Sequence, residues 1–171
     1  MAHDLTTLYK VYMVGGSALG IASIDTPEVD HITETLSGSG IMGEIDMPTL
    51  LVKSMTVKLV FTNKLSGWVK LQAPGVHHLD CRLDIQSTDK TDDSYKHIAE
   101  RITMRVMKKK SGFGKIEQGK KQDSESEFEV LYIKHVVDGK ETLEIDKLNE
   151  KYVVDGTDHM AVVRQNTGME G

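Results

Sequence analysis

The stretch YIKHVVDGKETLEI, residues 132–145, holds two runs rich in β-branched and apolar residues on either side of Asp138-Gly139. An Asp-Gly pair readily adopts the positive φ angles of a type I′ turn, whose twist matches that of two antiparallel strands. The stretch therefore predicts a β-hairpin with one strand over residues 132–137 and the other over residues 141–145.

Apolar residues alternate with polar ones in other parts of the chain, which indicates strands that bury one face. These runs are Leu79, Cys81, Leu83 and Ile85; Ile102, Met104 and Val106; and Val57, Leu59 and Phe61. Gly15-Gly16 separates two further runs and predicts an opening hairpin.

Helical spacing is scarce in the sequence. Residues 63–72 predict one short helix that stops before Pro74-Gly75, and residues 158–165 form a second, weaker candidate. The whole pattern predicts one mainly β domain over residues 1–171, a β-sandwich or partly closed barrel with one short helix.

Composition narrows the classes of function. The 171-residue chain has a formal net charge of −5 and a single cysteine, Cys81, so no internal disulfide can form. A weakly acidic chain is a poor general nucleic-acid binder, because such binding depends on Lys and Arg. The N-terminus does not have the pattern of a signal peptide, and no apolar stretch approaches the ~18 residues of a membrane span. We therefore expect synthesis and folding in the cytoplasm and no membrane partner.

Motifs of catalysis and of metal binding are missing from the sequence. There is no Gly-x-Ser-x-Gly, His-Glu-x-x-His or phosphate-loop pattern. His77-His78 with Asp80 and Cys81 suggests a metal site, but a strand places Cys81 on the face opposite His78 and Asp80. We therefore expect neither an enzyme nor a cofactor, and we expect Cys81 to be a buried, inert thiol.

Two segments do not fit a compact monomer. Residues 28–46 (EVDHITETLSGSGIMGEID) carry five acids and no Lys or Arg around a Gly-rich centre, and they predict a long acidic hairpin that projects from the core. Residues 108–121 (KKKSGFGKIEQGKK) carry six Lys against one Glu, and four acids follow by residue 129. Residues 108–126 are therefore predicted to be a flexible, charge-segregated loop.

The order of these segments resembles the tail tube proteins of contractile-tailed bacteriophages. The most specific part is VDGKETLEIDKLNEKYVVDGTD, residues 137–158, with its DGKE hairpin, EID, an Asn and a second turn. Residues 104–130, MRVMKKKSGFGKIEQGKKQDSESEFEV, follow the family's order of strand, basic Gly-rich loop and acidic strand start. Gly38-Ser39-Gly40 and Met42-Gly43-Glu44 are similar to the family's hairpin tip.

The resemblance implies an assembly as well as a fold. Six copies would form a ring, long hairpins of neighbouring copies would pair into an inner β-barrel, and the rings would stack inside a contractile sheath. The partners would then be other copies of the chain, the sheath, the tape measure protein and the baseplate. The protein would reside in the virion tail, and DNA would pass through the lumen without specific binding.

The two charged segments and the resemblance together lead to hypotheses about two sets of residues. The candidates for lumen-facing acids are Glu34, Glu44 and Asp46, although the period of two in a strand allows only some of them to face the bore. The candidates for contacts between assembled subunits or with the sheath are Lys108, Lys109, Lys110, Lys115, Lys120 and Lys121.

Three alternatives remain open from the sequence. The chain could form the tube of a headless R-type bacteriocin or of another contractile injection particle. It could form a ring similar to the type VI secretion tube. It could also be a small β module that binds nucleic acid through residues 108–121, although Phe113 is the only aromatic residue there for stacking on a base.

Overall fold

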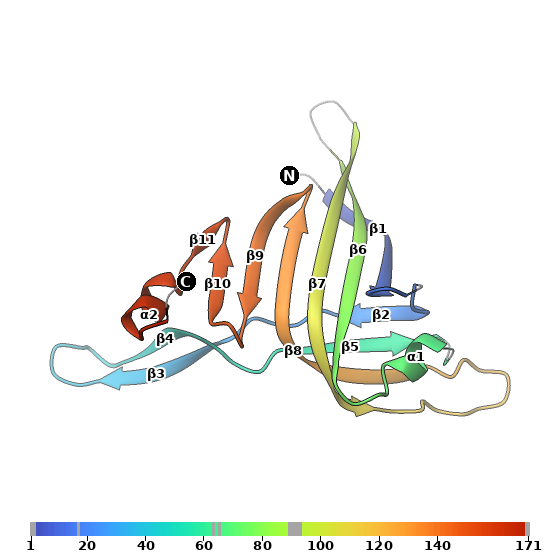
Figure 1. Cartoon of the computed structure of the whole chain (residues 1–171), viewed down its shortest axis with the longest axis horizontal. Helices are drawn as coiled ribbons and strands as arrows, with labels where there is room; N and C mark the ends of the chain where they lie inside the picture. Colours follow the sequence, from blue (N-terminus) through green and yellow to red (C-terminus); the bar gives the residue numbers. More distant parts are fainter. Residues whose placement is uncertain (1–2, 17, 63, 65, 89–93, 170–171) are drawn as a thin grey trace.

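A computed structural model describes residues 3–16, 18–62, 64, 66–88 and 94–169. Its main feature is a nine-stranded antiparallel sheet (Figure 1). Seven strands follow one another across it: β1 (His3–Met13), β6 (Val76–Thr88), β7 (Tyr95–Ser111), β8 (Ser124–Val137), β9 (Lys140–Asp146), β10 (Lys151–Val154) and β11 (Thr157–Asp158). The other two, β5 (Thr56–Phe61) and β2 (Ile21–Asp25), branch from β8.

The Asp-Gly hairpin is confirmed. Strands β8 and β9 pair from Val137↔Lys140 to Tyr132↔Asp146. Asp138 and Gly139 connect them with φ angles of 47° and 79°, the two positive values that a type I′ turn requires.

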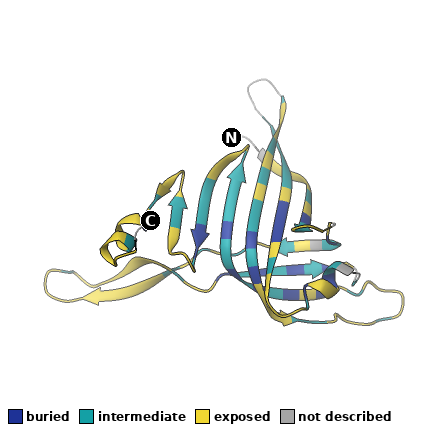
Figure 2. Ribbon diagram, viewed as in Figure 1, coloured by how far each residue is buried: buried dark blue, intermediate teal, exposed yellow. Residues whose placement is uncertain are grey.

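Strand β8 explains where the core lies. Its first half pairs with β5 and its second half with β9, so β5 and β2 pass beneath one end of the sheet. Phe128 and Val130 of β8 are fully buried there, together with the alternating residues Val57, Leu59 and Phe61 of β5. Figure 2 shows the buried positions gathered at this end, while the far ends of the strands are half-buried or exposed.

The predicted alternation of buried and exposed residues is confirmed in β5 and at Met104 and Val106 of β7. In β6 it is confirmed only in part, because Asp80 is buried together with Leu79 and Cys81 on either side of it, and the strand is half-buried from residue 83 to its end. Asp80 can be buried because Arg82 and Arg101 both donate to its carboxylate.

The predicted fold class is correct at the level of a mainly antiparallel β protein. Within the described part of the chain, the strands form no closed barrel. The predicted opening hairpin around Gly15-Gly16 is wrong as a strand pair, because β1 pairs with β6 and β2 pairs with β5. An isolated bridge joins Tyr12 to Ala18. The core is covered because one sheet folds over at β8.

The helix count is corrected from one to two. Helix α1 (Ser66–Lys70) lies within the predicted residues 63–72, of which 63 and 65 fall outside the described residues. Helix α2 (Ala161–Asn166) lies where the weaker candidate was placed. The Arg164 guanidinium holds α2 by donating to the Glu150 carbonyl (2.7 Å) and to Asp158 (2.6 Å). Neither helix has the length and apolar character needed to cross a lipid bilayer, as far as the described residues extend.

Strands β3 (His31–Ser37) and β4 (Glu44–Val52) form a separate two-stranded sheet. Figure 1 shows this hairpin pointing away from the main sheet. A projecting hairpin was predicted over residues 28–46, but its second strand continues six residues further, to Val52.

Candidate assembly surfaces

The β3–β4 hairpin has two chemically different faces. Directly opposed residues of an antiparallel pair share a face, and successive residues alternate between faces. The pairs Glu34↔Met47 and Leu36↔Ile45 therefore form one face, which we call the apolar hairpin face. The pairs Thr35↔Asp46 and Ser37↔Glu44 form the other, the polar hairpin face. The Thr35 hydroxyl donates to Asp46 Oδ1 at 2.6 Å across this polar face.

This register separates the three acids proposed for the lumen. Glu44 and Asp46 lie together on the polar hairpin face, and Glu34 lies opposite them among apolar side chains. One orientation of a regular hairpin therefore cannot aim all three into a bore. The lumen-facing role of Glu44 and Asp46 stays a prediction.

The apolar hairpin face is a feature that the sequence analysis missed. Ile45 is 51% exposed and Met47 is 53% exposed, and Leu36 beside them is also exposed. The alternation of Glu44, Ile45, Asp46 and Met47 contained this signal, but a strand ending at residue 46 hides it. Neither outer edge of the hairpin pairs with another strand in the described part of the chain. Exposed apolar side chains on such a hairpin mark a surface suited to another chain.

The root of the hairpin borders an apolar groove of about 260 Å³. One wall is formed by Ile32, Leu50 and Leu51 of the hairpin, and the other by Tyr152 and Met160. The ring of His31 also lies 5.5 Å from that of Tyr152. These contacts fix the place from which the hairpin leaves the domain.

The basic segment is more structured than predicted. Lys108, Lys109 and Lys110 belong to the end of β7, and β8 starts at Ser124, so the connecting loop covers only residues 112–123 of the predicted 108–126. The lysines fall in a strand because β7 continues its ladder with β8, from Lys108↔Phe128 to Ser111↔Ser126. The flexibility of the remaining loop stays a prediction.

Four of the six candidate lysines have partners within the chain. Lys108 donates to the Gln72 carbonyl (3.2 Å) and Lys109 to the Thr56 hydroxyl (3.1 Å). Lys115 and Lys120 both contact Glu117, at 2.6 and 2.7 Å. Among the described residues, no partner is found for Lys110 or Lys121, and these two are the freest for contacts with another molecule.

An aromatic contact that the sequence analysis did not identify holds the loop to the domain. The Phe113 ring meets the Trp68 ring of α1 edge-on, with centroids 5.4 Å apart, and Lys64 Nζ lies 5.2 Å from the Phe113 centroid. The Gln122 side chain also donates to the Phe113 carbonyl at 3.0 Å, which links the two arms of the loop.

Gly114 provides a test of this loop conformation. Its φ is +77°, and an added Cβ would lie 2.2 Å from the Asp123 carbonyl oxygen. Gly119 has nearly the same φ, +75°, but open space around its Cβ position. Gly114→Ala should therefore lower the free energy of unfolding by about 1–3 kcal/mol more than Gly119→Ala, because only Gly114 adds a backbone clash to the backbone strain. Urea denaturation of both variants measures this, and equal losses would contradict the loop geometry.

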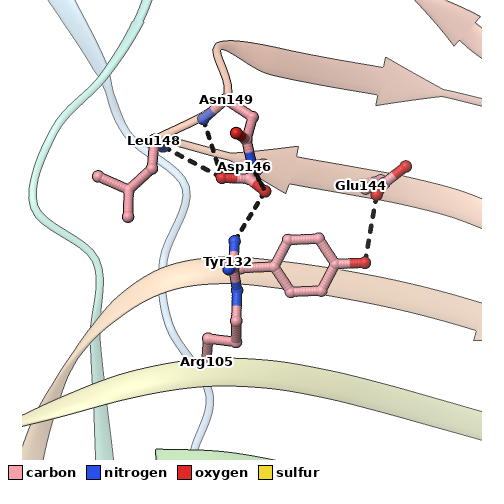
Figure 3. A network of polar contacts seen from close by, with 6 residues as sticks. All are labelled: Arg105, Tyr132, Glu144, Asp146, Leu148 and Asn149. Atoms are coloured by element: carbon pink, nitrogen blue, oxygen red, sulfur yellow. Dashed lines mark hydrogen bonds and ion pairs between the residues drawn. The ribbon is translucent and has the colours of Figure 1, made fainter. Parts of the chain in front are cut away.

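A polar network explains the EID and Asn positions of the sequence motif (Figure 3). Asp146 Oδ1 accepts from the backbone N–H groups of Leu148 and Asn149, both at 3.1 Å. Asp146 Oδ2 accepts from the Asn149 side chain and from the Arg105 guanidinium, both at 2.7 Å. Arg105 also lies over the ring of Tyr132, whose hydroxyl donates to Glu144 at 3.2 Å.

This network ties the β9–β10 turn to β7, two strands away. Burial alone raises the pKa of Asp146, but the hydrogen bonds from Asn149 and the charge of Arg105 outweigh it and hold the pKa below its ordinary value. Leu148 is held at the turn and is 66% exposed, so the network presents an apolar side chain to solvent.

The Cys81 thiol lies in the core and not at the surface. Cys81 is buried, and that burial, with the charges of Asp80 and Glu100, raises the pKa of its thiol to about 11. Such a thiol is a poor nucleophile at neutral pH. Across the residues whose placement is described, no three His, Cys, Asp or Glu side chains are arranged to hold a metal ion.

The amino-acid sequence is similar to those of known phage proteins. Residues 6–168 match the family model described as phage tail tube protein FII. The tail tube protein of Escherichia phage P2 is 29% identical over 168 residues, which cover 95% of each chain.

The chain also matches solved structures from a contractile injection system. The sheath/tube terminator of an extracellular contractile injection system, PVC, matches with a TM-score of 0.50 and 11% identity, over 76% of this chain and 94% of that chain. A chain of the PVC sheath–tube complex matches with a TM-score of 0.49 and 12% identity, over 75% and 87%. At such identities, the terminator supports the fold alone.

Proposed function

The chain belongs to the phage tail tube protein FII family and is a structural, non-enzymatic tail tube subunit of a contractile tail, and from this we propose how its hairpin builds the tube. Six copies close into a ring, the β3–β4 hairpins contribute to an inner β-barrel, and the rings stack. The observation that carries this proposal is the projecting hairpin with one polar and one apolar face.

The two faces have different roles in the proposed barrel. The polar hairpin face, with Glu44 and Asp46, is directed to the bore. The apolar hairpin face rests against neighbouring subunits, because only that face gains free energy by leaving water. Glu34 then lies between subunits, where a carboxylate requires a charged or hydrogen-bonding partner.

The charge of the hairpin suits a conduit for DNA. Residues 28–46 carry a net charge of −5 without a single Lys or Arg. An acidic wall repels phosphate, so DNA would slide without binding. The nucleic-acid-binding alternative has weaker support, because four of the six basic-segment lysines have internal partners.

The proposed partners extend beyond the ring itself. The sheath would surround the tube, a terminator would close its end, and the tape measure and baseplate proteins would complete the tail. The same subunit would serve in a headless particle such as an R-type bacteriocin. A ring like that of type VI secretion would carry cargo in its bore instead.

Electron microscopy of the purified protein tests the proposal. Across a series of protein and salt concentrations, we expect rings or tubes with a central hole. A high-resolution map should place Glu44 and Asp46 at the bore and Glu34 between subunits. Rings whose hairpins point outward, or whose bore excludes Glu44 and Asp46, would contradict the proposed role of the hairpin.

A further inference from the structure

Strand β1 has a long open edge on the side of the main sheet remote from the hairpin (Figure 1). Its inner edge pairs with β6 from His3↔Thr88 to Met13↔Leu79. On its outer edge, the pairings among described residues are confined to the far end: the Tyr12–Ala18 bridge and the Leu19 N–H donated to the Val11 carbonyl. No strand in the described part of the chain covers residues 4–8 on this side.

Two large apolar side chains on this open edge are exposed to solvent. Leu5 is 67% exposed and Leu8 is 61% exposed. They lie opposite Gln86 and Asp84, which are two residues apart on β6, so both leucines point to the same face. On that face, Leu8 borders a groove of about 330 Å³ that also includes Tyr12, Asp84 and Ala99. An open edge strand with exposed apolar side chains readily pairs with another strand unless it is covered.

We propose that the open edge of β1 in one subunit receives strand β3 from the hairpin of the adjacent subunit, through backbone hydrogen bonds. This inference rests on the proposed ring, for which it specifies the receiving strand. The contact joins two different surfaces head to tail, which is the kind of contact that closes a ring of identical subunits. It also covers the exposed edges of both partners at once.

Strand β3 is favoured over β4 by its backbone chemistry. Each of its residues, His31–Ser37, has an N–H to donate. Strand β4 contains Pro48, which cannot donate, and its pairing with β3 is irregular between Pro48 and Val52. Proline in a sheet is confined to edges that stay open, so β3 is the better partner for β1.

Charge also favours this pairing. Lys10 lines the β1 groove, and no ion-pair partner is found for it among the described residues. The hairpin carries acids on both faces, Glu34 on one and Glu44 with Asp46 on the other. Lys10 would therefore meet an acid whichever hairpin face lies on its side of the joined sheet.

Cysteine cross-linking in assembled particles tests the inference. The native Cys81 is buried and does not compete. Each double variant has one cysteine in β1 and one in β3. In β1 the cysteine replaces Leu5 or Leu8, which lie on either side of the β-bulge at Thr7. In β3 it replaces Glu34 or Thr35, which lie on opposite faces of the strand. Adjacent strands are about 4.8 Å apart and the next strand about 10 Å away, and a disulfide needs Cα atoms within about 7 Å. We expect at least one pair to form covalent ladders up to the full ring under mild oxidation.

The opposite strand gives a matched control. Met47→Cys and Asp46→Cys lie directly across from residues 34 and 35, so they should remain unlinked to β1. Ladders from β4 cysteines alone would overturn the choice of β3. Disulfide dimers from Leu5→Cys or Leu8→Cys alone would show that β1 meets β1 and would overturn the head-to-tail contact. Normal tubes with no β1 linkage would refute this inference alone, whereas a wild-type chain that forms no ring would count against the proposed function.

Discussion

A variant in which a short Gly-Ser linker replaces residues 33–48 is expected to fold as a monomer and to form no rings or tubes at any concentration. The removed residues form their own two-stranded sheet and contribute none of the buried core. Thr33 and Pro48 face each other, so a linker of a few residues spans the cut. The root residues Ile32 and Leu50 are kept. We therefore expect the free energy of unfolding to change by no more than about 1 kcal/mol.

Sedimentation velocity, negative-stain electron microscopy and thermal unfolding measure the two parts of this prediction separately. The matched control is Glu44→Gln with Asp46→Asn, which keeps the length and the apolar hairpin face while removing two charges. The control should still assemble. A truncated chain that melts like the wild type and still builds rings would show that the hairpin does not join the subunits.

Features set by neighbouring residues could be predicted from the sequence. The Asp138-Gly139 turn is encoded by two residues, and the buried positions of β5 follow from strict alternation. The burial of Asp80 in β6 does not follow from it, because that position depends on Arg101 in the neighbouring strand. The predicted hairpin ends at residue 46, six residues before the end of β4, because Pro48 and the acids before it are poor strand signals. The residues around Pro48 form a strand because they pair with β3, which propensity alone does not register.

Features set by distant residues could be predicted only in part. The run Lys108–Lys110 looks like a loop in the sequence, but the pairing of β7 with β8 holds it in a strand. The motif around Asp146 and Asn149 was visible, whereas its partner Arg105 lies 41 residues from Asp146. That contact follows from the alignment of Arg105, Tyr132 and Asp146 across three strands.

Asp146→Ala should be the most destabilising substitution of a polar residue in this network, with a loss of about 2–3 kcal/mol in the free energy of unfolding. Two backbone N–H groups and the Asn149 amide lose their acceptor, and Arg105 loses its charge partner. Removing one member of a buried pair costs about 3–5 kcal/mol, but the Arg105 side chain is 30% exposed and water recovers part of this. Glu125→Ala is the control, because its ion pair with Lys58 lies at the surface and should contribute less than about 1 kcal/mol.

The pH dependence of the free energy of unfolding distinguishes the contribution of the Asp146 charge from that of its packing. The pKa of Asp146 is lower in the folded protein than in the unfolded chain, so its ionised form contributes stability above the ordinary Asp pKa of about 4. This contribution is lost as the pH falls through the folded-state pKa. The gap between wild type and Asp146→Ala in urea denaturation should therefore be full at pH 7 and shrink steadily below about pH 4. A gap of equal size at pH 7 and in strong acid would show that side-chain packing, and not the charged network, holds the β9–β10 turn against β7.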